Sequence, residues 1–390
     1  MASQDTSIWK SIWSSRTRDM MSKKINRSCL RRGDIIYHQH SAEGISRLCS
    51  KRFCKKNIAN DIGDVFLIIP KAVAPLSDKL RKSLTAYEDF VVVNPGAMVM
   101  PHHYQDWHQS YQDFQVQPTD VWVASYPKAG TTWTQEMVWC ILNKLDFEGA
   151  KAKLMIRFPF FEWETLIPKE LPEGLDANDP CAPGQQWRII NSMPSPRTIK
   201  THLHMPLLPS SMQKDKPKII YVTRDPRDVC TSYYYHSIKL DGYQGEFSEF
   251  VDFFLGDTLP WSPFWSNVLG YWAKRHEDNV LFIRYEEMKE DLSVVIKRVS
   301  KFLSVELNPK EIETLEAHLS FSSMSKNKAV NNESIIRVEN NGKEESTKFM
   351  RKGQVGDWKN HLTKEQQNAF KEWTIKHLIG SDFPYYQDYK

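Results

Sequence analysis

The chain has 390 residues, of which 41% are hydrophobic, 26% charged and 12% aromatic, and its formal net charge at pH 7 is +4. This composition indicates a globular protein, and the length allows one large α/β domain or two ordinary ones with a sizeable core. No stretch approaches the roughly 20 apolar residues of a membrane-spanning helix. We therefore expect neither a membrane segment nor a membrane partner.

Positive charge is concentrated at the N-terminus. Residues 1–60 contain 13 Lys or Arg against 4 Asp or Glu, whereas the rest of the chain contains 39 against 44. A mildly acidic main body argues against a nucleic-acid partner. The basic, Ser- and Arg-rich composition of residues 1–60 is similar to that of a mitochondrial presequence, but no helix with a clear apolar face is evident. We interpret these residues as a disordered extension.

Residues 61–120 are expected to be an irregular lead-in, because Pro75, Pro95, Pro101 and Pro118 limit regular structure there. The six cysteines of the chain form no CxxC pair and show no zinc-type spacing. Those at positions 140 and 230 fall within predicted helices, which indicates buried, reduced thiols of an intracellular protein.

Residues 121–143 combine a strand, a tight turn and a helix. The run VWVAS at 121–125 suits a buried strand, PKAG at 127–130 breaks the pattern, and helical periodicity begins at Thr131. Free N–H groups in the first turn of the helix, the helix dipole and the charge of Lys128 attract an anion. The segment predicts a phosphate cradle, although an ordinary turn with a solvated lysine would have the same outline.

The turn departs from the usual nucleotide-binding sequence G-x-x-x-x-G-K-[ST], because its lysine precedes the glycine. A magnesium–ATP site is therefore disfavoured, and we expect a phosphate ligand that is handled without a metal. A nucleotide kinase stays open as a function of a different class.

The stretch TIKTHL at 198–203 predicts a second strand, and side-chain alternation places Lys200 and His202 on the same side of it. A histidine at a strand edge is more often structural than catalytic. Its position after the phosphate turn, with a lysine beside it, favours a general base, because a neutral imidazole at pH 7 suits that role.

Two more strand–helix pairs follow. Residues 218–222 predict a strand that leads into a helix ending at residue 236, and Pro226 is a signal for the start of that helix. Residues 280–284 predict a strand, and a long helix is expected over 289–303. Alternating strands and helices predict an α/β fold in which helices flank both faces of a parallel sheet.

Three later segments complete the expected architecture. Residues 331–348 are polar and predict a flexible surface loop. The basic stretch FMRKG at 349–353 follows this loop and suits a lid that clamps a phosphate. A final helix is expected over Lys364–Leu378.

Four stretches resemble the signatures of the cytosolic sulfotransferases, namely YPKAGTTW at 126–133, KTHL at 200–203, TRDPRDVCTSYYYH at 223–236 and FMRKGQVGDWKN at 349–360. They occur in the family's order. The resemblance implies one catalytic domain over 85–388 with a P-loop-like α/β fold, preceded by a lead-in at 61–84. It also implies a cytoplasmic conjugating enzyme that uses 3′-phosphoadenosine-5′-phosphosulfate (PAPS) as sulfuryl donor and releases PAP.

The resemblance further implies which residues bind the donor. The first signature would hold the 5′-phosphosulfate, with Trp133 stacking on adenine, and the second and C-terminal signatures would hold the 3′-phosphate. The full implied set is Lys128, Ala129, Gly130, Thr131, Thr132, Trp133, Arg224, Ser232, Tyr285, Leu319, Ser320, Phe321, Met324, Phe349, Met350, Arg351, Lys352 and Gly353.

Four residues would carry the transfer. His202 matches the family's catalytic base, which takes the proton of the acceptor hydroxyl. Lys128 supplies positive charge where negative charge grows on the leaving phosphate, and Lys200 contacts the sulfuryl oxygens or the surroundings of the base. For Ser232 we hypothesise a contact with Lys128 that restrains proton donation until the acceptor arrives.

The acceptor pocket is expected to take a flat, apolar phenol, steroid or alcohol. Phe160 and Trp163 match aromatic positions of that pocket in the family, and Lys200 and His202 would complete it. From the residues alone, such an aromatic cluster is more often core than ligand wall. His204 stands where the family usually has proline, which would alter the edge of the acceptor site.

Two other positions depart from the family. Ala129 stands where a serine is frequent, and the backbone cradle should survive that change. In the family's dimer motif, Lys364 replaces a valine and Asn368 replaces a glutamate, so a homodimer stays open.

Three other functions are weighed against a PAPS-dependent sulfotransferase. One is an activity like that of retinol dehydratase, in which a sulfated alcohol eliminates. The others are the nucleotide kinase and a ligand carrier with an inactive site. The last is disfavoured because all the expected catalytic residues are present.

Overall fold

The computed structural model describes residues 68–70, 75–171, 176–331 and 349–385. The expectations for the basic extension at 1–60 and for almost all of the polar loop at 331–348 fall outside the described residues. Within those ranges, no helix is both long enough and apolar enough to cross a membrane.

A four-stranded parallel sheet forms the centre of the molecule, with the strand order β5-β4-β6-β7. In register, Val121 of β4 pairs with Thr198 of β5 on one side and with Lys218 of β6 on the other. The sheet confirms the predicted α/β class, and each strand lies close to its expected bounds. The strands are β4 (Val121–Ala124), β5 (Thr198–Thr201), β6 (Lys218–Thr223) and β7 (Val280–Arg284).

Helices cover both faces of this sheet, as predicted. Trp122 of β4 and Tyr221 of β6 pack into one apolar cluster, whereas the neighbouring Val123 and Ile220 pack into a second cluster. This alternation places the two clusters on opposite faces. The first cluster includes residues of α9 (Pro226–His236), α10 (Phe247–Leu255), α11 (Phe264–Trp272) and α16 (Lys364–Leu378), and the second includes residues of α5 (Thr131–Leu142), α13 (Leu292–Phe302) and α14 (Pro309–His318).

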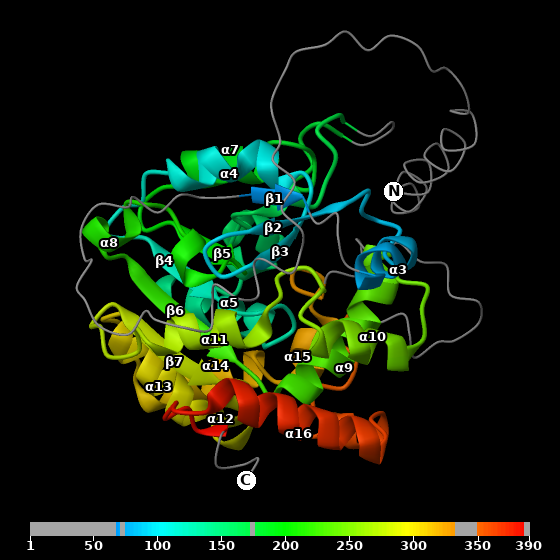
Figure 1. Cartoon of the computed structure of the whole chain (residues 1–390). Coiled ribbons are helices and arrows are strands. Elements are labelled where there is room, and N and C mark those ends of the chain that lie inside the picture. The colour runs from blue at the N-terminus through cyan, green and yellow to red at the C-terminus, as the bar shows by residue number, and fades with distance from the viewer. Residues whose placement is uncertain (1–67, 71–74, 172–175, 332–348, 386–390) are drawn as a thin grey trace, which may run out of the picture.

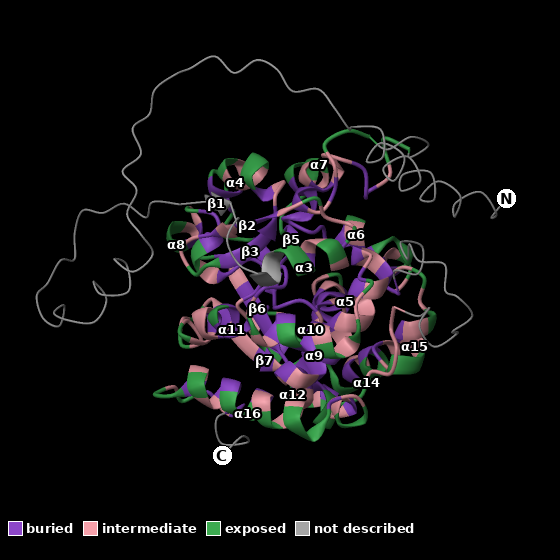
Figure 2. Cartoon of the chain, turned by 45° about the vertical axis from the view of Figure 1, so that its right-hand side comes forward, coloured by how far each residue is buried: buried purple, intermediate pink, exposed green. Residues whose placement is uncertain are grey.

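Figure 1 shows α16 along the bottom of the view and the pair α4 (Tyr104–Gln112) and α7 (Gln185–Ser192) at the top. Buried residues gather in the central strands and in the inner faces of the helices, and α16 carries exposed residues on its outer side (Figure 2). The remaining α-helices of the described residues are α3 (Pro75–Ser83), α6 (Leu154–Arg157), α8 (Met212–Asp215), α12 (Tyr285–Glu290) and α15 (Phe321–Lys326).

The expectation of an irregular lead-in over 61–120 is wrong. Its described part contains α3, α4 and a three-stranded antiparallel sheet of β1 (Ile68–Pro70), β2 (Phe90–Val93) and β3 (Met98–Pro101). Two apolar runs, FVVV and MVMP, are separated by the turn residues NPGA, which is the pattern of a β-hairpin. Pro95 lies in this turn and Pro101 at the end of β3, where they remove no hydrogen bond that the sheet needs, whereas Pro75 opens α3 and Pro118 lies in a turn before β4.

The predicted long helix over 289–303 is two helices. Helix α12 ends at Glu290, and α13 starts at Leu292 because the Asp291 side chain accepts the backbone N–H of Val294 at 3.0 Å and caps it. The other helical predictions hold. Helix α9 begins at Pro226 behind the capping residue Asp225, and α16 has the expected bounds.

Candidate functional site

The residues that follow β4, β5 and β6 line one cavity of about 300 Å³. Parallel strands place their carboxyl ends at the same edge of a sheet, which brings the turn after β4, His202 after β5 and Arg224 after β6 together. The segment 349–354 closes the same cavity. All the site residues named from the sequence line it except Ala129, which is buried behind the turn, and Ser320, which caps α15.

The turn after β4 is shaped for close approach of a ligand to the backbone. Lys128 and Gly130 have φ angles of 68° and 113°, and α5 begins directly after Gly130. A Cβ atom on Gly130 would lie 2.9 Å from the ring of Tyr285. The turn therefore presents the N-terminus of α5, with its free N–H groups, to the cavity.

The imidazole of His202 is held in one tautomer. Its Nδ1 lies 2.7 Å from the carbonyl oxygen of Ser125, which can only accept, so Nδ1 carries the proton and Nε2 is left to accept one. Burial, together with Lys200, holds the pKa of His202 well below its usual range. The ring is therefore a neutral base inside the cavity.

Glu162 fixes the backbone around this base. Its carboxylate accepts the backbone N–H of His202 and the Thr201 hydroxyl, the latter at 2.8 Å. Lys200 lies with its Nζ 3.9 Å from the centre of the Phe160 ring. Burial raises the pKa of Glu162 and lowers that of Lys200. The two groups lie close enough that each partly offsets this effect in the other.

Lys128 contacts His236, a residue that the sequence analysis did not single out. Its Nζ lies 3.4 Å from Nδ1 of His236 and 4.2 Å from the centre of the Phe349 ring. The hypothesised contact with Ser232 is not formed among the described residues, although Ser232 lines the same cavity. Burial, followed by the charges of Lys200 and Lys239, lowers the pKa of Lys128 to about 7.

Asp228 and Asp357 hold the C-terminal basic segment against α9. Asp228 accepts the backbone N–H of Gly356 at 2.7 Å and that of Trp358 at 3.1 Å. The Asp357 carboxylate accepts from both Arg351 and Lys352. Neither aspartate was named from the sequence, and their role shows only once the chain is folded.

Arg224 also contacts that segment. Its guanidinium donates to the carbonyl of Gln354 at 2.7 Å and lies 4.3 Å from the centre of the Tyr285 ring. The predicted grouping of Arg224 with Arg351 around one cavity is thus present in the structure.

An aromatic wall lies beside the cationic end of the cavity. The Trp133 indole donates to the carbonyl of Leu319 at 2.9 Å, and its ring centre lies 5.5 Å from that of Tyr285. Phe321 is 39% exposed and packs against Gly353, where a Cβ would come within 2.3 Å of the Phe321 ring. A planar nucleotide base could stack on these aromatic rings without displacing core side chains.

The other end of the cavity is apolar and aromatic. Phe160 and Trp163 lie there, with ring centres 6.2 Å apart, and the ring centres of Phe160 and Trp261 lie 5.2 and 5.8 Å from that of His202. Tyr87, from the segment 61–120 that was expected to be an irregular lead-in, also lines the cavity. His204 does not line it, but its Nε2 lies 3.0 Å from the carbonyl of Trp261. His204 therefore affects the acceptor end only indirectly, through its contact with the backbone of Trp261.

The donor set fits a ligand with two phosphate groups. Arg224 Nε is a buried donor with no hydrogen-bond partner among the described residues, and Lys128, Lys200 and Lys239 line the same cavity. Burial lowers the pKa of all three lysines, and nearby positive charge lowers those of Lys128 and Lys239 further, so an added anion would offset this effect.

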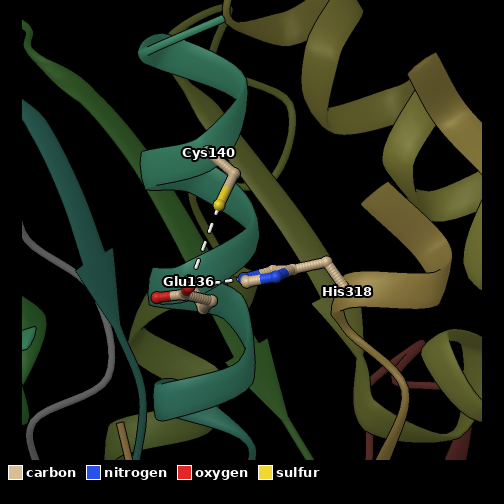
Figure 3. Close-up of side chains that lie close together, drawn as sticks. All are labelled: Glu136, Cys140 and His318. Atoms are coloured by element: carbon tan, nitrogen blue, oxygen red, sulfur yellow. Dashed lines mark hydrogen bonds and ion pairs between the residues drawn. The ribbon is translucent and has the colours of Figure 1, made fainter. Parts of the chain in front are cut away.

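A second cluster of ionisable groups lies outside this cavity. Glu136, Cys140 and His318 bring potential metal-ligand atoms within 4.8 Å of one another (Figure 3). However, one Glu136 oxygen accepts from Arg157 at 2.8 Å and the other pairs with His318 Nε2 at 2.7 Å. Burial also raises the pKa of the Cys140 thiol, which disfavours the thiolate. We interpret the cluster as a buried hydrogen-bonded network that fastens α5 to α6 and α14.

A parallel sheet whose strand ends carry an anion cradle, a neutral imidazole and a lysine suits an enzyme that transfers a group from an anionic donor. Residues 118–382 match the family model described as the sulfotransferase domain, and the chain belongs to this family. It is therefore an enzyme that transfers a sulfuryl group to a hydroxyl of a small molecule.

The chain is similar to luciferin sulfotransferase of Photinus pyralis, with 40% identity over 87% of this chain and 91% of that protein. Its fold is similar to retinol dehydratase in complex with androsterone and PAP, with a TM-score of 0.74 and 31% identity over 82% of this chain and 98% of that one. The complex of retinol dehydratase with retinol and PAP also has a TM-score of 0.74, at 30% identity over 82% and 99%.

Proposed function

We propose that this enzyme takes the sulfuryl group from PAPS, releases PAP, and transfers the group to a flat, largely apolar phenol, steroid or alcohol. The observation that carries the proposal is one cavity that brings together a neutral His202, the cations Lys128 and Arg224, and aromatic rings that lie next to the imidazole. The PAP complexes of retinol dehydratase support the choice of donor.

The phosphates would be held by residues from three parts of the chain. The 5′-phosphate would lie on the N–H groups of residues 130–132 with Lys128 beside it, and the 3′-phosphate would lie between Arg224, Ser232 and Arg351. Trp133, Tyr285 and Phe321 would enclose the adenine. Asp357 already holds Arg351 and Lys352 in position, so less side-chain freedom is lost on binding.

The bound donor supplies a sulfuryl group on a phosphate leaving group. His202 Nε2 takes the proton of the acceptor hydroxyl as the oxygen–sulfur bond forms. Lys128 stabilises the charge that appears on the leaving phosphate oxygen as the old sulfur–oxygen bond breaks. Lys200, whose Nζ lies over the Phe160 ring, offers a second positive charge toward the sulfuryl oxygens. The products are PAP, the sulfate ester and one proton.

The acceptor end favours ring compounds over charged or highly polar ones. Phe160 and Trp261 lie next to the imidazole and Trp163 lies beside Phe160, and such rings pack against flat apolar faces. The similarity to luciferin sulfotransferase and to a complex that holds androsterone supports this class.

Elimination after sulfation is the second candidate, because the fold is similar to that of retinol dehydratase bound to retinol. The two reactions differ in their product. Transfer leaves a stable sulfate ester, whereas elimination releases the sulfate and leaves an anhydro product. Incubating the enzyme with sulfur-labelled PAPS and panels of phenols, steroids and allylic alcohols tests both. A labelled ester supports transfer, an anhydro product supports elimination, and no donor turnover with any acceptor contradicts the proposal.

A further inference from the structure

The backbone carbonyl of Leu319 holds the indole of Trp133. Trp133 Nε1 donates to it at 2.9 Å, and Leu319 is the residue that caps the C-terminus of α14. The last carbonyl groups of a helix have no partner within the helix, so this one is available to a side chain. Trp133 belongs to the aromatic wall of the cavity, and the orientation of its ring therefore depends on where α14 ends.

The preceding residue, His318, fastens that end of α14 to α5. Its Nε2 lies 2.7 Å from Oε1 of Glu136, which follows Trp133 by three residues on α5. Figure 3 shows the His318 side chain reaching across to Glu136. Residues three apart lie on the same side of a helix. Two consecutive residues at the end of α14 thus contact two neighbouring side chains of α5.

The charge state of Glu136 fixes the direction of the second contact. Burial by itself would raise the pKa of Glu136, but the hydrogen bond from His318 and the charge of Arg157 hold that pKa below its usual value. A carboxylate can only accept, so His318 Nε2 carries a proton and donates. Such a charge-assisted bond is stronger than one between neutral groups. The His318 ring also lies against Phe147, with ring centres 4.6 Å apart, so two contacts limit its movement.

The same junction starts the helix that carries Phe321. Ser320 follows Leu319 and is the capping residue of α15, whose first residue is Phe321. Phe321 packs against Gly353 of the basic C-terminal segment. A shift at His318 would therefore reach Trp133 through the Leu319 carbonyl, and would reach Phe321 through the start of α15.

We propose that His318 is a positioning residue for the nucleotide base, because its bond to Glu136 holds the junction of α14 and α15 where Trp133 and Phe321 can receive a planar ring. This inference rests on the proposed function, in which these two side chains enclose the adenine of PAPS. His318 does not line the cavity, so it acts through Leu319 and not on the ligand. The bond of Arg157 to the other Glu136 oxygen would remain in its absence.

The first test uses the donor-free protein and does not depend on turnover. The protein is labelled with 5-fluorotryptophan, and the fluorine-19 signal of Trp133 is assigned with Trp133→Phe. This signal should shift in His318→Leu and return close to its wild-type position in His318→Gln, whose side-chain N–H can donate to Glu136 in place of the imidazole. A Trp133 signal that is the same in wild type and His318→Leu would overturn the inference.

The second test measures nucleotide binding by calorimetry. His318→Leu should weaken PAP and adenosine 5′-phosphate by the same factor, about fivefold, because both carry the base and only one carries the 3′-phosphate. In steady-state kinetics, KM for PAPS should rise by a similar factor while kcat at saturating PAPS stays within about twofold of wild type. His318→Gln should restore most of the affinity.

A matched control lies at the other end of α14. The Asn308 side chain accepts the backbone N–H of Glu311 at 3.0 Å and caps the start of that helix, outside the cavity. Asn308→Ala should lower stability but leave the affinity for both nucleotides unchanged. A loss of affinity in Asn308→Ala equal to that in His318→Leu would show a general effect of weakening α14 and would overturn the positioning role.

The failures of the two proposals can be distinguished. If wild type binds no PAP and turns over no PAPS, the proposed function is refuted, and the role of His318 in holding a base falls with it. If wild type binds PAP and transfers the sulfuryl group, but His318→Leu binds PAP as tightly as wild type, only the role of His318 is refuted.

Discussion

The carboxylate of Asp228 and the backbone N–H of Gly356, 128 residues apart in the chain, are joined by a hydrogen bond of 2.7 Å. This bond ties the helix that follows Arg224 to the segment that carries Arg351. Two cations from distant parts of the sequence thereby face one cavity, which is the arrangement that a 3′-phosphate needs.

Arg351→Ala should weaken PAP binding at least tenfold and leave the binding of adenosine 5′-phosphate nearly unchanged. A charge-assisted hydrogen bond contributes about 1.5–3 kcal/mol, and only PAP carries the phosphate that Arg351 would contact. Isothermal titration calorimetry with both nucleotides measures the difference. Arg275→Ala is the control, since Arg275 pairs with Asp382 outside the cavity. Equal losses for the two nucleotides would refute the assignment.

His202→Ala should lower kcat by about 10²–10⁴ while PAP affinity changes less than threefold, because the imidazole acts on the acceptor proton. The His202 ring contacts the Ser125 carbonyl and the Phe160 ring, and none of the cations expected to hold the phosphates. Steady-state kinetics together with PAP titration separate the two effects. A variant with wild-type kcat would remove His202 from the mechanism.

PAP binding should take up protons between pH 7 and 9. Burial lowers the pKa of Lys128 to about 7 and that of Lys239 to about 8, and bound phosphates would raise both, so each lysine gains a proton on binding in this range. Affinity should therefore fall as pH rises through 7–9, by up to tenfold per pH unit for each group. Calorimetry in two buffers of different ionisation enthalpy measures the uptake, which Lys128→Met should reduce. Pure proton release over this range would contradict the charge arrangement.

Gly353→Ala should impair donor binding beyond the cost of its backbone conformation. Gly353 has a φ of 62°, and a Cβ there would lie 2.3 Å from the Phe321 ring. Gly380→Ala is a matched control, because Gly380 has a φ of 79° and no atom within 4 Å of the added Cβ. Both variants should lose about 1 kcal/mol of stability from the left-handed conformation, but only Gly353→Ala should lose PAP affinity. Equal PAP affinity in the two variants would argue against a role for Phe321 in the donor site.

Arg157→Met should lower the free energy of unfolding by about 3–5 kcal/mol, because it leaves the Glu136 carboxylate buried with one partner fewer. The side chains of this pair are 4% and 0% exposed. Adding Glu136→Gln should recover part of the loss, since the uncompensated charge is then removed. Urea unfolding measures the change, and Lys151→Met, which breaks an exposed pair with Glu148, should leave the midpoint nearly unchanged.

Local patterns determined the framework of this protein. Apolar runs mark the strands at 121–125, 218–222 and 280–284, and Asp225 and Pro226 mark the start of a helix. The strands and this helix start could therefore be predicted from the sequence. The hairpin of β2 and β3 also has a local signal, NPGA between two apolar runs. It was not predicted because prolines in this segment disfavour regular structure. The break at Asp291 was a capping signal of the same kind.

Tertiary structure alone decided which groups meet. The contact between Lys128 and His236, the hydrogen bonds of Asp228 with Gly356 and Trp358, and the Tyr87 side of the cavity join segments far apart in sequence. Periodicity and capping report only on neighbours within a turn or two, because they arise from backbone hydrogen bonds and side-chain spacing along one element. Distances between elements are set by how apolar faces pack, and a hydrogen bond across 108 residues exists only after that packing is complete.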